Sequence, residues 1–191
     1  MYITTHIRLA NICYKYYKRE YNVNLDKKSF LYGSIEPDLH KRSKKIKHIY
    51  SVSVYKIKEY IEELKNEDLT LEEKSFLLGK ISHYTADCFC KYHLEEYYGH
   101  SMIKHFVYEF LLDLKLNYIL LFKRKIIRDI LINIGCKDEK YIDVLNANRE
   151  EYLNLKENSI NDLCYTVKTM CALIVCGSEN DICKKNARET K

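Results

Sequence analysis

Glycine and proline are scarce in this chain, which has five glycines and one proline among its 191 residues. Because these residues supply most of the turns between strands, the chain lacks the turn chemistry of a β-protein. Long stretches rich in Lys, Glu, Leu, Ile and Tyr repeat their apolar residues with a period near 3.6, which indicates amphipathic helices. With 47% hydrophobic residues, the chain can bury one full-sized core. We therefore predict an all-α, single-domain multi-helix bundle over residues 1–176, followed by a polar, flexible tail over 177–191.

The expected helices can be placed by their caps and breaks. We expect them at 2–19, 45–65, 70–98, 101–122, 138–154 and 159–176. The clearest start is Thr70, because a capping box with Glu73 opens the long helix that ends near Tyr98. Residues 22–45 are expected to form a loop after one short helical turn at 29–32.

We expect neither a targeting signal nor a membrane-spanning helix in this chain. The N-terminal residues show neither a basic region before an apolar run nor a small-residue cleavage site, so we expect no signal peptide and a cytoplasmic location. The most apolar later stretches, 116–135 and 160–176, are interrupted by charges and are not expected to span a membrane. The eight cysteines are interpreted as mostly buried thiols, because their spacings lack the paired CxxC signature of a structural zinc site.

Four of the seven histidines fall within residues 83–110. On a helix, residues four apart share one face, so His83 with Asp87 and His105 with Glu109 each present an imidazole beside a carboxylate. About one such pair is expected by chance among seven histidines and 27 acids, so the pairs alone are a weak signal. His93 is expected on the same helix as His83, about 80° around it, where it could join the second pair in a metal site.

Taken together, the histidines and acids of residues 6–109 resemble the zinc-dependent phospholipase C family, which is related to the single-strand-specific zinc nucleases. The family pattern is a histidine near the N-terminus, a loop aspartate, a second histidine, an HxxxD motif, a further histidine, and HxxxE or HxxxD. The residues that match this pattern, in order, are His6, Asp38, His48, His83, Asp87, His93, His105 and Glu109.

The resemblance implies an all-α fold that holds two to three Zn²⁺ ions. By position, the ligands of a first ion would be Asp38, His48, His83 and Asp87. Those of a second ion would be His93, His105 and Glu109, and a third would be bound by His6 and the shared Asp87.

The first residue also has a role in this resemblance. In the family, the third zinc is completed by the amino group and carbonyl oxygen of an N-terminal tryptophan. This chain has Met1 there and no tryptophan. Because only backbone atoms ligate, Met1 is expected to supply them, and an N-terminal tag is expected to damage the site.

The implied function is zinc-dependent hydrolysis of a phosphodiester by an activated water, with Asp38 as the candidate that orients or deprotonates this water. The substrate is expected to be a phosphate ester, with phospholipids among the candidates. Two alternatives stay open. The first is a nuclease or nucleotidase, which needs an aromatic platform and is permitted but not favoured by the basic residues 41–47. The second is a non-catalytic helical protein that binds metal for stability or sensing. The oligomeric state is left open.

Other residues near this pattern have secondary roles. His40 and His100 have no place in it and are interpreted as surface groups or as neighbours of the ligands. Tyr32, Tyr84 and Tyr92 are expected to lie near the cleft.

Overall fold

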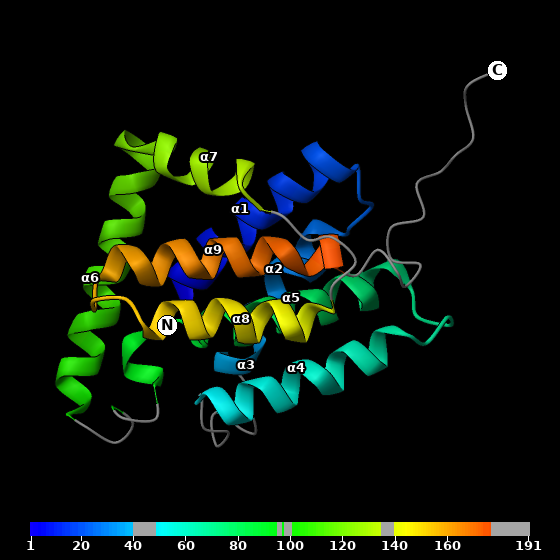
Figure 1. The fold of residues 1–191 in the computed structure, drawn as a ribbon. Helices are drawn as coiled ribbons and strands as arrows, with labels where there is room; N and C mark the ends of the chain where they lie inside the picture. The colour runs from blue at the N-terminus through cyan, green and yellow to red at the C-terminus, as the bar shows by residue number, and fades with distance from the viewer. Residues whose placement is uncertain (40–48, 95–96, 98–100, 135–139, 177–191) are drawn as a thin grey trace.

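The computed structural model describes residues 1–39, 49–94, 97, 101–134 and 140–176, and for residues 174–176 only the backbone. Its regular structure is entirely helical, which confirms the predicted all-α class, and the described residues form no strand (Figure 1). The elements are α1 (Ile3–Tyr21), α2 (Lys27–Gly33), α3 (Glu36–Leu39), α4 (Tyr50–Leu64), α5 (Leu71–Asp87), the 3₁₀ turn η2 (Lys91–His93), α6 (Met102–Phe122), α7 (Arg124–Ile132), α8 (Tyr141–Leu153) and α9 (Ser159–Cys176).

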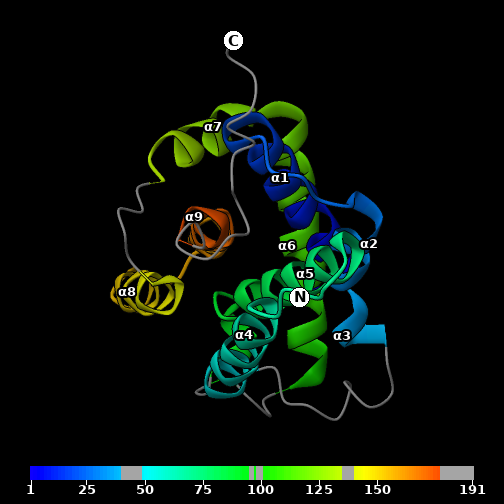
Figure 2. The same cartoon turned by 90° about the vertical axis from the view of Figure 1, so that its right-hand side faces the viewer.

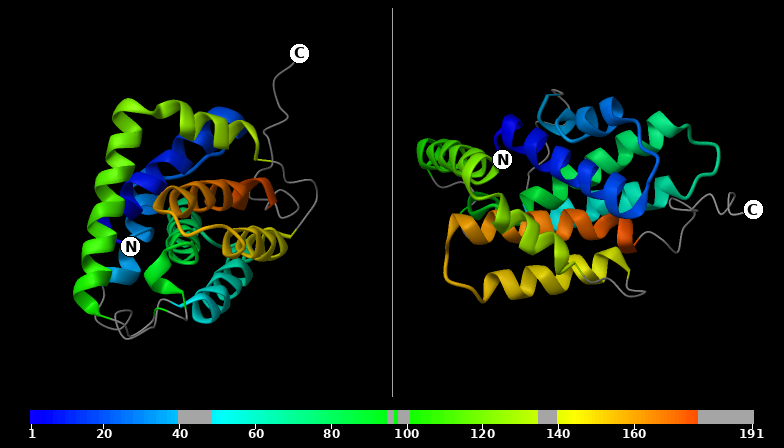
Figure 3. Two further views of the ribbon diagram at one scale, coloured as in Figure 1. Left: turned by 60° about the vertical axis from the view of Figure 1, so that its left-hand side comes forward. Right: turned by 90° about the horizontal axis from the view of Figure 1, so that it is seen from above.

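The helices gather around α5. This helix packs against α1, α2, α3, α4 and α9, and α8 lies beside α9 (Figures 1 and 2). Helix α6 runs along one edge of the molecule, where it contacts α1 and α7 (Figure 3). The core includes fully buried side chains from several helices, such as Leu9, Ile81, Leu116, Leu145 and Val167. Each such burial contributes about 1.5–3 kcal/mol, so the apolar faces hold the bundle together.

Several predicted boundaries are confirmed. The capping box at the start of α5 is present: the Thr70 Oγ1 accepts from the Glu73 backbone N–H at 3.2 Å, and Glu73 Oε2 accepts from the Thr70 backbone N–H at 2.8 Å. The predicted helices at 101–122, 138–154 and 159–176 correspond to α6, α8 and α9. The predicted tail at 177–191 lies outside the described residues.

The long helix predicted to end near Tyr98 is wrong at its C-terminal end, because α5 stops at Asp87. Hydrogen bonds to distant side chains engage the backbone groups that would otherwise bond within a continued helix. The Arg149 guanidinium donates to the carbonyl oxygen of Cys88, and the Lys91 N–H donates to Asp162 Oδ2 at 3.2 Å. His93 therefore lies on a separate turn, not on the helix that carries His83.

The loop predicted over residues 22–45 is also wrong in part. Asp26 caps α2 by accepting from the Ser29 N–H at 2.7 Å, so this helix extends from 27 to 33 rather than over a single turn. A further short helix, α3, places Asp38 on helical backbone, and its proline stands in the first turn, where a missing N–H costs nothing. Helix α4 begins at Tyr50. The basic run at 40–48 lies outside the described residues.

Helices α2 and α5 cross with glycine against glycine. A Cβ atom built on Gly79 would lie 2.2 Å from the Phe30 carbonyl oxygen and 2.9 Å from the backbone nitrogen of Ser34. A Cβ atom on Gly33 would lie 2.2 Å from the Phe76 carbonyl oxygen. Only glycine allows this approach, which brings the backbone at Ser34 against α5.

Replacing Gly79 by alanine is therefore expected to destabilise the fold by about 1–3 kcal/mol or more. Helix propensity alone predicts the opposite sign, a stabilisation of about 1 kcal/mol. The free energy of unfolding in urea measures the difference. Glu72→Ala, at an exposed position of the same helix, is the control and should change little. A Gly79→Ala protein as stable as the parent would show that the two helices do not need this close contact.

The outer face of α6 is apolar. Its exposed large side chains are Met102, Ile103, Phe106, Val107, Phe110, Leu111, Leu114, Tyr118, Leu121 and Phe122, and we call this set the apolar face of α6. Such a continuous set differs from the singly scattered apolar residues that are normal on protein surfaces. No helix in the described part of the chain is both long and apolar enough to cross a bilayer.

Candidate metal centre

The N-terminal end of α1 is anchored to α6. Thr4 Oγ1 and Thr5 Oγ1 each donate to Asp113 Oδ1 at 2.9 Å, and Arg8 donates to the same oxygen. Burial alone would raise the pKa of Asp113, but these three donors lower it. The carboxylate thus stays ionised and fixes the start of α1, where Met1 and His6 are buried.

Helix α5 supplies a buried histidine and carboxylate. His83 and Asp87 stand four residues apart on one face, with His83 Nε2 lying 3.3 Å from Asp87 Oδ2. The other ring nitrogen of His83, Nδ1, lies 3.0 Å from the carbonyl oxygen of Ser34 and must donate to it. In the neutral ring this bond places the lone pair on Nε2, which is the arrangement of a metal-binding histidine. The glycine crossing of α2 and α5 therefore also orients a candidate ligand.

The η2 turn and α6 bring a second group to the same place. His93 Nε2 and His105 Nε2 lie 2.9 Å and 2.8 Å from Glu109 Oε1. His93 Nδ1 lies 3.2 Å from Asp87 Oδ1, so this ring lies between the two carboxylates. Burial would lower the pKa of His93, but the neighbouring Asp87 raises it above its usual value. Burial would likewise raise the pKa of Glu109, but the Met1 amino group and the two histidines hold it far below its usual range.

The backbone nitrogen of Met1 lies between these two groups. It is 2.8 Å from Asp87 Oδ1, 3.2 Å from Glu109 Oε1 and 3.5 Å from His93 Nε2. Burial would lower the pKa of this amino group, but Asp87 and Glu109 raise it well above its usual value. The ammonium is thus a buried cation held by two carboxylates.

His6 and Asp38 complete the cluster. The rings of His6 and His83 stack with centroids 4.1 Å apart, and His6 Nε2 lies 3.5 Å from Asp87 Oδ1. Asp38 lies at the more open side, with its carboxylate oxygens 3.8 Å from His6 Nε2 and from His83 Nε2.

The structure brings together most of the residues predicted from the sequence. Those that converge are Met1, His6, Asp38, His83, Asp87, His93, His105 and Glu109. His48 lies outside the described residues, as do His40 and His100. Of the tyrosines expected near the cleft, Tyr92 stacks on His105 and Tyr84 packs edge-on against His83, while Tyr32 stacks on Phe76.

The arrangement fits metal binding. Two atoms that bind one tetrahedral zinc ion at 2.0–2.2 Å are about 3.3–3.6 Å apart. The Nε2 atoms of His83 and His6 stand 3.3 Å and 3.5 Å from the oxygens of Asp87. The Nε2 of His6 is buried and makes no hydrogen bond to a described group. Burial and the neighbouring His83 lower the pKa of His6 to about 4, so this ring is neutral at pH 7, as a ligand must be.

Ligand-type atoms form two close groups among the described residues. His6, His83 and Asp87 make up one, and Cys90, His93 and Glu109 make up the other, with the atoms of each group within 4.8 Å of one another. Cys90 was not predicted as a ligand. Its spacing of three residues from both Asp87 and His93 is a sequence signal, but it becomes informative only once α5 is known to end at Asp87.

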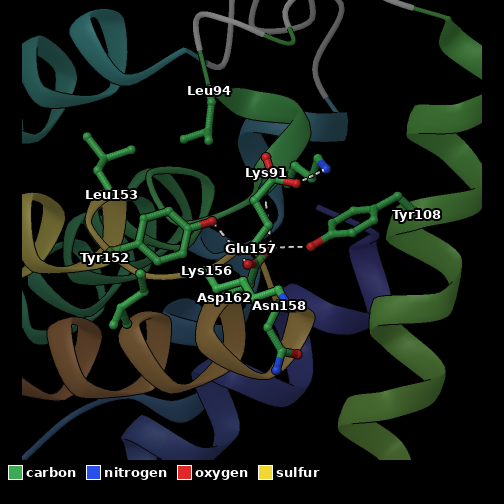
Figure 4. Close-up of a pocket in the computed structure, with 10 residues that line it drawn as sticks. Lys91, Leu94, Tyr108, Tyr152, Leu153, Lys156, Glu157, Asn158 and Asp162 are labelled. Atoms are coloured by element: carbon green, nitrogen blue, oxygen red, sulfur yellow. Dashed lines mark hydrogen bonds and ion pairs between the residues drawn. The ribbon is translucent and has the colours of Figure 1, made fainter.

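The buried carboxylate of Asp162 holds the η2 turn in place through hydrogen bonds. Asp162 lines a small cavity of about 90 Å³ together with Lys91, Tyr108 and Tyr152. The hydroxyl groups of the two tyrosines point to the Asp162 carboxylate (Figure 4). Tyr152 donates at 3.0 Å, Tyr108 also donates, and the Lys91 N–H donates at 3.2 Å. Burial raises the pKa of Asp162. This carboxylate ties η2, α6, α8 and α9 together and so holds His93 beside Glu109.

Replacing Asp162 by alanine is expected to destabilise the fold by about 2–4 kcal/mol, because three donors would lose a buried acceptor. The urea midpoint should fall accordingly. Glu157→Ala is the matched control: Glu157 lines the same cavity but bonds Lys91 and Tyr97 at the exposed surface, so its loss should cost under about 1 kcal/mol. Equal effects of the two substitutions would contradict this role of Asp162.

A family model described as zinc dependent phospholipase C matches residues 5–162 of the chain. The matched segment begins just before His6, contains the described side chains of the metal centre and ends at Asp162. No curated protein and no solved structure matches the chain significantly.

Proposed function

The chain belongs to the zinc-dependent phospholipase C family, and from this premise we propose that it hydrolyses a phosphodiester at a cluster of zinc ions. The observation that carries the proposal is the convergence of three carboxylates, four imidazoles and the Met1 nitrogen from α1, α3, α5, η2 and α6. Placing buried carboxylates side by side is costly unless cations compensate their charge.

We propose that the cluster holds two to three ions. Asp38, His83 and Asp87, with His48, would bind the first. A second would be bound by His93, His105 and Glu109, and a third by Met1, His6 and the shared Asp87. The position of Asp87 supports a shared role, since its two oxygens face His83 on one side and His6, His93 and Met1 on the other.

Bound zinc ions supply Lewis acidity: they lower the pKa of water from about 15.7 towards 7 and stabilise negative charge on phosphoryl oxygens. The contribution of the chain is to orient its ligands and exclude bulk water. The Ser34 carbonyl fixes the ring of His83, and the side chains of His83 and Asp87 are fully buried. His105 and Asp38 face solvent more, with side chains 36% and 23% exposed, so the substrate would enter beside them.

Asp38 is proposed as the residue that orients the attacking water or accepts its proton. Its carboxylate stands 3.8 Å from both His6 and His83 and is the more exposed of the two carboxylates in this half of the cluster. A general base needs both contact with the reacting water and a path for the proton to leave, and partial exposure provides this path.

The substrate is proposed to be amphiphilic, as a phospholipid is. Tyr2 packs edge-on against Phe106 and Phe110, with ring centroids 5.6 Å and 6.4 Å away. The apolar face of α6 therefore passes beside Tyr2, the residue after Met1, on the helix that carries His105 and Glu109. An apolar chain attached to the phosphodiester could lie along this face while the phosphate reaches the metal centre.

A nuclease or nucleotidase is the second candidate. Binding a base requires an exposed aromatic ring near the phosphate site. Tyr32 is 47% exposed and stands two residues before Ser34, which bonds His83. Its ring stacks on Phe76 with centroids 5.7 Å apart, so a base could contact at most one side of it.

Two measurements on untagged protein test the proposal. Elemental analysis after purification without chelators is expected to find two to three zinc ions per chain. Hydrolysis rates are then compared for a short-chain phospholipid, a soluble choline phosphodiester and single-stranded DNA. Preference for the phospholipid supports the amphiphilic substrate, and preference for DNA supports the nuclease. Bound zinc without turnover of any of them would favour the non-catalytic metal protein, and substoichiometric metal would exclude a zinc enzyme.

A further inference from the structure

Cys90 lies inside the proposed metal centre, in the half formed by η2 and α6. Its side chain is fully buried, and its Sγ lies within 4.8 Å of a ring nitrogen of His93 and of a carboxylate oxygen of Glu109. His105 Nε2 lies 2.8 Å from Glu109 Oε1. One thiol, one imidazole and one carboxylate therefore lie close enough together to bind one ion, and His105 adjoins this group through Glu109.

The backbone holds Cys90 and His93 in a fixed relation. Cys90 is the residue that caps η2, and its carbonyl oxygen accepts from the His93 N–H at 2.9 Å. Its own N–H donates to the Asp87 carbonyl oxygen at 3.3 Å. A Cys-x-x-His spacing on a tight turn presents both side chains to one ion, as in the short-spaced ligand pairs of zinc sites.

The other described cysteines are placed differently. The Sγ atoms of Cys13 and Cys171 lie 3.3 Å apart between α1 and α9, and Cys164 is half-buried on α9. Cys88, two residues before Cys90, is buried but belongs to neither group of ligand-type atoms among the described residues. Of the five cysteines whose side chains the structure describes, Cys90 is the one that shares a group with histidine and carboxylate ligand atoms.

We propose that Cys90 binds, as a thiolate, the metal ion held by His93, His105 and Glu109. This inference rests on the metal centre of the proposed function and adds to it. The thiol loses its proton to solvent when the ion binds, and the sulfur–metal bond forms without any oxidation or reduction.

A thiolate ligand changes the role that this ion can have in catalysis. Four protein ligands close a tetrahedral site, whereas catalytic zinc sites keep a position open for water. The water-activating role then falls to the half of the centre formed by His6, His83, Asp87 and Asp38. A sulfur ligand also favours zinc over magnesium, calcium or manganese at this position.

The test uses cobalt as a spectroscopic substitute for zinc. Untagged protein is stripped with a chelator and loaded with Co²⁺. We expect a near-ultraviolet thiolate-to-cobalt charge-transfer band, which Cys90→Ser should abolish while the visible ligand-field bands remain. Zinc affinity at one site should fall at least about tenfold. Cys88→Ser is the matched control and should keep the band, as should a chain with Cys136, Cys176 and Cys183 replaced by serine.

A second readout needs no variant at Cys90. Zinc X-ray absorption of the parent protein should contain a sulfur scatterer at about 2.3 Å. Cobalt binding and phosphodiester hydrolysis without any sulfur signal would overturn the thiolate and leave the proposed function standing. A sulfur signal that persists in Cys90→Ser would also overturn it. Failure to bind metal at all would overturn both proposals.

Discussion

Replacing Asp87 by asparagine is expected to remove bound zinc and to lower kcat/KM for phosphodiester hydrolysis at least about 1,000-fold. The reason is that its two oxygens face His6, His83, His93 and the Met1 nitrogen at 2.8–3.5 Å, so one substitution affects both halves of the cluster. Elemental analysis and initial rates measure the two losses.

The metal-free protein should also respond to this change. Without the carboxylate, the buried ammonium of Met1 loses one of its two counter-ions, which we expect to cost about 3–5 kcal/mol in the free energy of unfolding. Circular dichroism at low temperature shows whether the variant is still folded when its metal is counted.

Asp38→Asn is the informative comparison. Asp38 lies 3.8 Å from the histidine nitrogens and at the exposed side of the cluster, so we expect this variant to keep more of its metal than Asp87→Asn while losing activity. Full zinc content and full activity in Asp87→Asn would exclude the proposed cluster. Equal metal loss in both variants would show that Asp38 acts through metal binding alone and has no separate role on the water.

Residues added before Met1 are expected to remove about one zinc ion per chain and to lower activity at least about 100-fold. The Met1 nitrogen is buried between Asp87 and Glu109, and the side chain of this residue is buried as well. An added peptide would replace the amine by an amide, which cannot donate a lone pair to a metal, and would need space that the cluster does not have. Zinc per chain and initial rates are compared with those of protein that begins at Met1.

The same added residues placed after Lys191 provide the control, since they leave the Met1 amine unchanged. Intact mass must confirm the N-terminus of each preparation. An N-terminally extended protein with full zinc content and full activity would show that the Met1 nitrogen is not a ligand.

Several features of the site follow from local rules. The pairing of His83 with Asp87, and of His105 with Glu109, needs only the helical repeat, which places residues four apart on one face. The start of α5 at Thr70 needs only the capping box, whose two hydrogen bonds lie within four residues. The order of the histidines and acids was enough to indicate the family, because it is a property of the chain and not of its packing.

Contacts between distant residues decided the rest. Helix α5 ends at Asp87 because Arg149 and Asp162, more than sixty residues away, bind the backbone at Cys88 and Lys91. That ending places Cys90 beside His93 and Glu109 and puts His93 on its own turn. Helical periodicity across residues 70–98 gave no sign of this break.

The sequence by itself determined that the chain is helical and which residues face together within each helix, because both depend on neighbours three or four positions apart. Only the tertiary structure decided that Met1 reaches Asp87, that the Ser34 carbonyl orients His83, and that Cys90 lies beside His93 and Glu109. These contacts depend on how whole helices cross, as Gly33 and Gly79 allow for α2 and α5, and no local pattern encodes the outcome of that packing.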